Sequence, residues 1–169
     1  MGDNALVREM RKISQGFMET WRDQRNETRY DPQVQFFGAI VVAGSGTLRV
    51  ILHAIPAKMA PPPQYRAQVL RALVQDARGV GGFFGAEAYS VQLPAGGQRS
   101  DLPADFADLP ADQRQECLLF SLSWPLGSAI FQAPITDSVV GEWTELPGAE
   151  GRLTDMLGAE TRPAAAVDA

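Results

Sequence analysis

The most constraining feature of the sequence is a pair of apolar segments separated by a short glycine-containing turn. Residues 34–43 (VQFFGAIVVA) and 47–55 (TLRVILHAI) are dense in β-branched and aromatic residues, which favour extended strands. Gly44-Ser45-Gly46 between them supplies the positive φ angles that a tight reversal requires. These residues predict a β-hairpin. One face of its second strand carries a set that is expected to face the core: Leu48, Val50, Leu52 and Ala54.

Three further strands are expected, at residues 83–92, 116–124 and 129–137. In the second of these (ECLLFSLSW), alternation places four apolar side chains on one face: Leu118, Phe120, Leu122 and Trp124. Pro134 lacks the N–H that a ladder needs, so the last strand is assigned to a sheet edge or a bulge. Helices are expected at about residues 4–24 and 62–77. The prediction is an α+β fold, in which a mostly antiparallel sheet of about five strands carries both helices on one face.

The 169 residues predict one hydrophobic core with terminal extensions. The parts are an N-terminal helix and turn (1–31), an α+β domain (32–146) and a C-terminal tail (147–169). No apolar run approaches the roughly 18 residues that span a bilayer, and the N-terminus carries charges where a signal peptide is apolar. We therefore expect no membrane association and a location in the cytoplasm of the producing cell. The single cysteine, Cys117, excludes an intrachain disulfide.

The N-terminal segment carries an apolar stripe at helical spacing: Leu6, Met10, Ile13, Phe17 and Trp21. Such a stripe usually packs on the sheet of its own domain. The same spacing also serves a helix that docks into a groove of a partner, and terminal helices are frequent examples. The stripe is therefore a candidate partner-binding surface.

Charge is distributed unevenly along the chain. Residues 1–100 hold twelve basic and eight acidic side chains, whereas residues 101–169 hold three and twelve. Such asymmetry fits contact with a basic partner or between neighbouring subunits, and it also fits ordinary solvated faces. The absence of a basic run interleaved with aromatic residues argues against nucleic-acid binding.

Residues 101–112 (DLPADFADLPAD) repeat the pentapeptide Asp-Leu-Pro-Ala-Asp. The aspartates are spaced four, three and four residues apart, whereas an EF-hand loop needs acids at alternate positions and a glycine at the sixth. The spacing instead fits short helical turns capped by aspartate in an acidic loop between two strands. We expect no metal ion and no cofactor. The loop can bind a basic protein partner, with Leu102, Phe106 and Leu109 as apolar anchors.

A search for catalytic groups gives few candidates. His53 and Cys117 or a nearby serine would be needed for a nucleophilic triad, yet both lie within predicted strands and no nucleophile-elbow motif is present. Glu87 lies in the middle of an apolar strand. Buried there, its carboxyl would have a raised pKa and could act as a general acid or base together with Glu116. A charge on a solvated face, or one paired with an arginine from the expected helix at 62–77, explains Glu87 more simply, because the sequence shows no pocket for catalysis.

Residues 34–137 resemble small uncharacterised proteins of tailed bacteriophages and prophages, through Ala86-Glu87-Ala88-Tyr89 and Arg114-Gln115-Glu116. The resemblance implies a phage setting and no mechanism. The sequence as a whole favours a non-enzymatic interaction or assembly protein, either a virion component or an accessory factor, whose partner is another protein or a second copy. The alternative is a small carboxylate-dependent hydrolase using Glu87 or Glu116.

Overall fold

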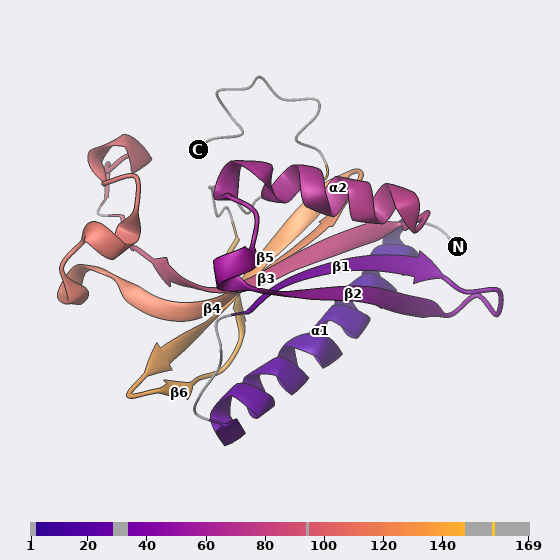
Figure 1. Ribbon diagram of the computed structural model, residues 1–169, viewed down its shortest axis with the longest axis horizontal. Helices are drawn as coiled ribbons and strands as arrows, with labels where there is room; N and C mark the ends of the chain where they lie inside the picture. Colours follow the sequence, from indigo (N-terminus) through magenta and orange to yellow (C-terminus); the bar gives the residue numbers. More distant parts are fainter. Residues whose placement is uncertain (1–2, 29–33, 94, 148–156, 158–169) are drawn as a thin grey trace.

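The computed structural model describes residues 3–28, 34–93, 95–147 and 157. Within these residues a seven-stranded sheet has the order β2-β1-β3-β4-β5-β6, and β7 also pairs with β5 (Figure 1). Every strand pairing is antiparallel, which confirms the α+β class and the mostly antiparallel sheet. The elements are α1 (Asp3–Thr28), β1 (Val34–Val42), β2 (Leu48–Pro56), α2 (Arg66–Asp76), β3 (Gly81–Ser90), β4 (Gln115–Trp124), β5 (Gly127–Thr136), β6 (Val139–Val140) and β7 (Thr144–Glu145). The predicted tail lies outside the described residues, except for Pro147 and Leu157.

The predicted hairpin is formed by β1 and β2. Their register runs without interruption from Val34 opposite Pro56 to Val42 opposite Leu48. The N–H of Ala43 donates to the carbonyl of Thr47 at 2.8 Å, and Gly46 adopts a φ of 80° in the turn. The glycine is required here because side-chain-bearing residues rarely adopt that φ.

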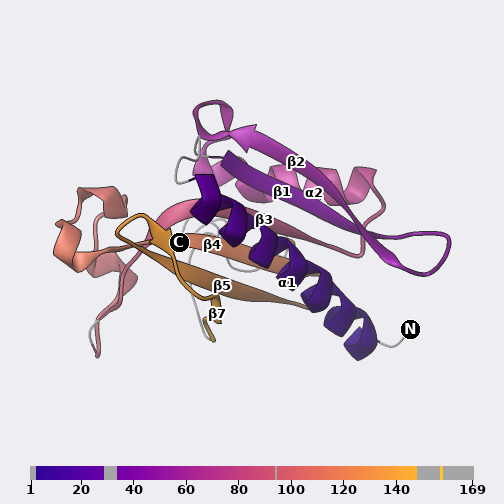
Figure 2. The same ribbon diagram turned by 90° about the horizontal axis from the view of Figure 1, so that it is seen from below.

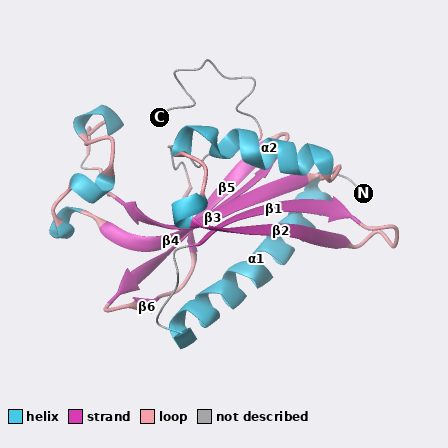
Figure 3. Ribbon diagram, in the orientation of Figure 1, coloured by secondary structure: helices cyan, strands magenta, loops and turns pink. Residues whose placement is uncertain are grey.

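The two helices cover opposite faces of the sheet, so the prediction that both pack on one face is wrong (Figure 3). Adjacent phenylalanines explain the difference, because successive side chains of a strand point to opposite faces. Phe36 and Phe83 lie on the side of α1, whereas Phe37 and Phe84 pack beneath α2. A sheet that is apolar on both faces needs a cover on each.

The N-terminal stripe packs into the core of its own domain. Met10 and Trp21 are buried, while Leu6, Ile13 and Phe17 are half-buried against the same cluster. In this conformation the stripe is not available to a partner, and its assignment as a partner-binding surface is wrong. The helix is therefore a layer of the domain and not a separate N-terminal part.

An aromatic cluster joins α1 to the sheet. The Phe17 ring lies 4.9 Å from that of Phe83, which stacks on Phe120 at 4.8 Å, and Trp21 meets Phe36 edge-on at 5.1 Å. Such contacts add to the hydrophobic gain of burying the rings. Gly38 makes room for them, because a Cβ there would lie 2.3 Å from the Phe83 ring.

The alternating residues of β4 are placed largely as predicted. Leu118, Phe120 and Leu122 are fully buried on the side of α1. Trp124 is only half-buried, because it is the last residue of the strand, where its ring packs beside Gly127 and under the guanidinium of Arg11.

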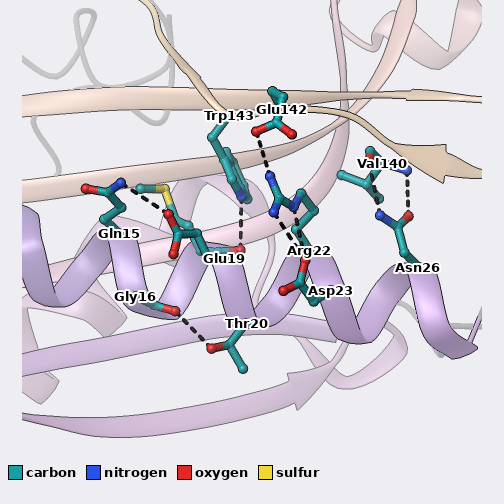
Figure 4. Close-up of polar contacts among 11 residues, drawn as sticks. Gln15, Gly16, Glu19, Thr20, Arg22, Asp23, Asn26, Val140, Glu142 and Trp143 are labelled. Atoms are coloured by element: carbon teal, nitrogen blue, oxygen red, sulfur yellow. Dashed lines mark hydrogen bonds and ion pairs between the residues drawn. The ribbon is translucent and has the colours of Figure 1, made fainter.

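The segment after β5 folds back and holds α1 in place (Figure 4). The Asn26 side chain accepts from the N–H of Val140 at 2.8 Å and donates to its carbonyl at 3.1 Å. Trp143 donates to the Met18 carbonyl at 2.9 Å, and Arg22 pairs with Glu142 at 2.8 Å. The carbonyl of Pro134 accepts from the N–H of Gly141, so the backbone nitrogen and carbonyl of Pro134 point away from β4. A proline is tolerated there because that side of β5 needs no N–H for the ladder with β4.

Replacing Phe120 by alanine should destabilise the protein by about 3–5 kcal/mol, because a fully buried ring is lost and a cavity remains. Urea-induced unfolding measures this difference. Val139→Ala, at the exposed position of β6, is the control and should change the free energy of unfolding by no more than about 0.5 kcal/mol. Equal midpoints for the two variants would contradict the core assignment.

Deleting residues 1–28 should abolish cooperative unfolding, since removal of α1 exposes the aromatic face of the sheet to water. Circular dichroism during heating measures cooperativity. A truncated chain that still melts in one sharp transition would mean that α1 is dispensable for the core.

Candidate functional site

Glu87 and Glu116, the two acids selected from the sequence, lie on neighbouring strands and on the same face of the sheet. In the register of β3 and β4, Glu87 is opposite Leu118, and Tyr89 is opposite Glu116. Because side chains alternate along a strand, the two acids are diagonal neighbours on the face that α1 covers. The fold therefore brings the predicted pair together.

Arg25, in the last turn of α1, reaches the first of these acids. Its Nη2 lies 3.5 Å from Oε1 of Glu87, and the side chains are only 10% and 11% exposed. The remaining donors of Arg25, Nε and Nη1, are buried and have no hydrogen-bond partner in the described part of the chain. Glu87 is thus held by an arginine of the N-terminal helix, and not by one from residues 62–77 as the sequence suggested.

The pKa of Glu116 is raised above its ordinary value of 4.5. The main cause is a hydrogen bond with Glu87, followed by burial and by the charge of Glu87. The charges of Arg25 and Arg114 act in the opposite direction. Glu116 therefore keeps its proton to a higher pH than a free carboxyl does, mainly because of its hydrogen bond with Glu87.

Such a pair can in principle transfer a proton, but its two members differ in access. Glu116 is an exposed residue, whereas Glu87 lies beneath α1 in its ion pair with Arg25. General acid-base chemistry requires the acting group to reach the substrate. Glu116 is therefore the only one of the two that a bound molecule could contact directly.

Arg114 connects this face to the aspartate-rich loop. Its guanidinium stacks on the Tyr89 ring at 4.3 Å and donates to the carbonyls of Phe106 and Ala107. The loop is thereby fastened beside the acid pair. Figure 1 shows the segment between β3 and β4 extending beyond the sheet.

The aspartate repeat forms short helical turns, as the sequence predicted. Three single turns occur, at Arg99–Asp101, Phe106–Asp108 and Ala111–Gln113. Asp105 caps the second by accepting from the N–H of Ala107 at 2.9 Å. The four aspartates are exposed, and the apolar residues Leu102, Phe106 and Leu109 are half-buried. That these three anchor a partner stays a prediction.

The histidine and the cysteine are far apart. His53 lies on β2, and Cys117 lies on β4, with β1 and β3 between them. At the usual strand spacing, this separation is about 14 Å. Burial raises the pKa of the Cys117 thiol to about 11, which keeps it protonated and unreactive at neutral pH. Among the described residues, no three His, Cys, Asp or Glu side chains gather where they could hold a metal ion.

One hollow of about 480 Å³ lies between the first half of α1 and the β1–β2 turn. It is lined by Glu9, Lys12, Ile13, Gly46, Thr47 and Leu48. It lies toward the opposite end of α1 from Arg25, so it does not serve the acid pair.

The surface that the sequence did not reveal is the outer part of β2. Leu52 and Ala54 were expected in the core, but Ile51, Leu52, His53 and Ala54 are all exposed. Leu52 is 42% exposed, and Ile51, on the other face, is 41% exposed. The reason is position, since β2 is an edge strand whose only partner among the described strands is β1. Leu48 and Val50, nearer the turn, remain half-buried against the core.

Comparison of the chain with protein-family models, with curated proteins and with solved structures found no match. Neither helix described by the structure is apolar over enough of its length to cross a membrane. Two features of the described residues bear on function, the acid pair and the open edge of β2.

Replacing Glu116 by glutamine should raise the melting temperature at neutral pH. Because the folded-state pKa of Glu116 is raised, its contribution to stability is full below 4.5 and is lost as the pH rises through the folded-state value. Glutamine removes this loss, and its amide can still donate to Glu87. The gain should vanish in acid, where Glu116 is protonated in both states.

Thermal unfolding of both proteins over a pH series tests this expectation, with Glu27→Gln on the exposed side of α1 as the matched control. A difference in melting temperature between Glu116→Gln and wild type that stays constant with pH would contradict the raised pKa of Glu116.

Proposed function

We propose that this chain is a non-enzymatic interaction or assembly protein that binds its partner through the open edge of β2. The observation that carries the proposal is the exposure of four consecutive residues, 51–54, on both faces of an edge strand. Figure 2 shows β2 as the outermost strand on its side of the sheet. An edge of this kind is a template for pairing with another chain.

The composition of β2 supports a binding role. Arg49 is its only permanently charged residue, and proline occurs only at its last position, Pro56. The uninterrupted register with β1 contains no bulge. Charges, prolines and bulges are the usual means by which proteins prevent edge pairing, and β2 uses almost none of them.

The other side of the sheet is closed. Two short strands, β6 and β7, pair with the outer side of β5, and Asn26 of α1 occupies the backbone groups of Val140. Among the described residues, one edge of the sheet is protected and the other is open, which supports a specific role for β2.

The phage or prophage setting enters this proposal only through the resemblance of residues 34–137. Within such a setting, the chain would be a virion component or an accessory factor. Both roles require a protein partner, and neither requires catalysis.

The alternative, a carboxylate-dependent hydrolase, is favoured by one feature, the raised pKa of Glu116 beside Glu87. The ion pair of Glu87 with Arg25 beneath α1 weighs against it, because a substrate could not reach Glu87 without displacing the helix. Hydrolysis of a chromogenic ester that is lost in Glu87→Gln would establish the alternative.

Replacing Leu52 by lysine should abolish partner binding without unfolding the protein. Leu52 is already half exposed, so a lysine is tolerated in the free chain, whereas its charge would be buried in a pairing interface. Capture with a tagged chain from producing cells, quantified by mass spectrometry, measures the loss.

The matched control is Leu126→Lys. Leu126 is 83% exposed in the connection between β4 and β5, so the same chemical change is made away from β2. Equal recovery of the same proteins with Leu52→Lys and with wild type would contradict a role for this edge.

A further inference from the structure

We propose that the partner of β2 is a second copy of this chain, paired antiparallel with β2 about a two-fold axis through Leu52. The two sheets would then join into one. This inference rests on the proposed function, since it names the occupant of the same edge.

The direction of the backbone groups follows from two hydrogen bonds. The N–H of Ala43 donates to the carbonyl of Thr47, so odd-numbered residues of β1 bond to β2. The N–H of Val80, just before β3, donates to the carbonyl of Ile40, so even-numbered residues of β1 face β3. In an antiparallel pair, hydrogen-bonded residues alternate along each strand. The residues of β2 that bond to β1 are therefore the odd-numbered ones. The residues whose N–H and carbonyl groups face away from β1 are Leu48, Val50, Leu52 and Ala54.

These outward groups define a self-complementary ladder. When Leu52 faces Leu52 of a second copy, Val50 faces Ala54, and Leu48 faces Pro56. This register uses the whole strand from Leu48 to Pro56. A shift by two residues in either direction leaves two residues at an end of each strand without a strand partner, so the centred register forms the longest ladder.

The side chains agree with the same register. Arg49 faces Ile55, and His53 faces Ile51, so no two basic side chains are directly opposed. A shift by two residues toward the turn would set Arg49 against His53 and leave Ile55 without a strand partner. The centred register therefore gives both Arg49 and His53 an apolar partner across the pair, whereas the shifted register does not.

Apolar burial adds to the backbone pairing. The Leu52 side chains of both copies meet at the axis on the side of α1, flanked by Val50 and Ala54, and Ile51 is covered on the opposite face. The pairing thus removes from water two of the large apolar side chains that the free chain leaves exposed. A second copy supplies both requirements of the edge, backbone partners and apolar cover.

A two-fold axis perpendicular to the sheet keeps both α1 helices on one face of the joined sheet. α1 packs over Phe36, Phe83 and Phe120 of β1, β3 and β4, and its first half also lies beside the turn end of β2 at Leu48. Leu52, where the axis passes, is 42% exposed, so α1 leaves the centre of the edge uncovered. One strand pair covers less than a standard interface of roughly 1,200–2,000 Å², so the dimer should dissociate on dilution.

Sedimentation velocity of the full chain over a wide range of concentration is the test. We expect a species of twice the monomer mass of 18.3 kDa at high concentration and the monomer on dilution. Leu52→Lys should be monomeric throughout. Leu52→Pro should be monomeric too, because it removes an outward N–H that makes no bond to β1. Leu126→Lys should behave as wild type, and melting curves confirm that each variant is folded.

Cross-linking tests the register. In a Cys117→Ala background, which leaves no other thiol, Leu52→Cys should give a covalent dimer with a short thiol-to-thiol reagent. Leu126→Cys in the same background should give none. Failure of Leu52→Cys to cross-link in a sample that sediments as a dimer would overturn the axis through Leu52.

Different results would overturn self-pairing of β2 and the broader proposal that β2 binds a protein partner. A wild-type chain that is monomeric at every concentration, or a dimer that persists in both Leu52 variants, overturns self-pairing. If the monomeric wild type still captures another protein that Leu52→Lys loses, the edge binds a different partner and the proposed function stands. If it captures none, both the self-pairing and the proposed function are wrong.

Discussion

The packing of α1 against the sheet is the contact on which the remaining features depend. Phe17 and Trp21 bring an aromatic surface to Phe36, Phe83 and Phe120, with ring centroids about 5 to 6 Å apart. Burial of these rings provides a large part of the apolar gain on that face. Because the return segment at Val140 to Trp143 hydrogen-bonds to the helix, the docked helix also organises the closed side of the sheet.

The acid pair is best understood as a consequence of that docking. The last turn of α1 lies over the second half of β3, and Arg25 therefore meets Glu87 in a place shielded from water. A buried carboxylate without a cation would be strongly destabilising, so Arg25 makes the position of Glu87 acceptable. Glu116 then lies beside a charge that is already compensated, and the hydrogen bond between the acids raises its pKa. The arrangement explains both acids without a substrate.

Local patterns predicted the elements well, because each depends on neighbouring residues. The β1–β2 hairpin follows from its glycine turn, and the buried face of β4 follows from alternation around Phe120. The errors concern relations between distant segments. Whether Leu52 is buried depends on β2 being at an edge, and this depends on the strand order, which no local pattern encodes. The adjacent phenylalanines at 36–37 and 83–84 did carry the signal for two covered faces. The contact of Glu87 with Glu116 required the register of β3 and β4.

The open edge has a geometric origin. A helix with its side chains is about 10 Å wide, and strands are spaced by nearly 5 Å, so one helix covers roughly two or three strands. The five long strands of this sheet are wider than that, and in the described part of the chain each face carries one of the two α-helices. α1 covers the middle strands and is drawn toward β5 by Arg22 and Asn26, which bond to the return segment. The strand that receives least cover is therefore β2, and its exposed apolar residues Ile51, Leu52 and Ala54 can be covered only by another chain or by residues that the structure does not describe.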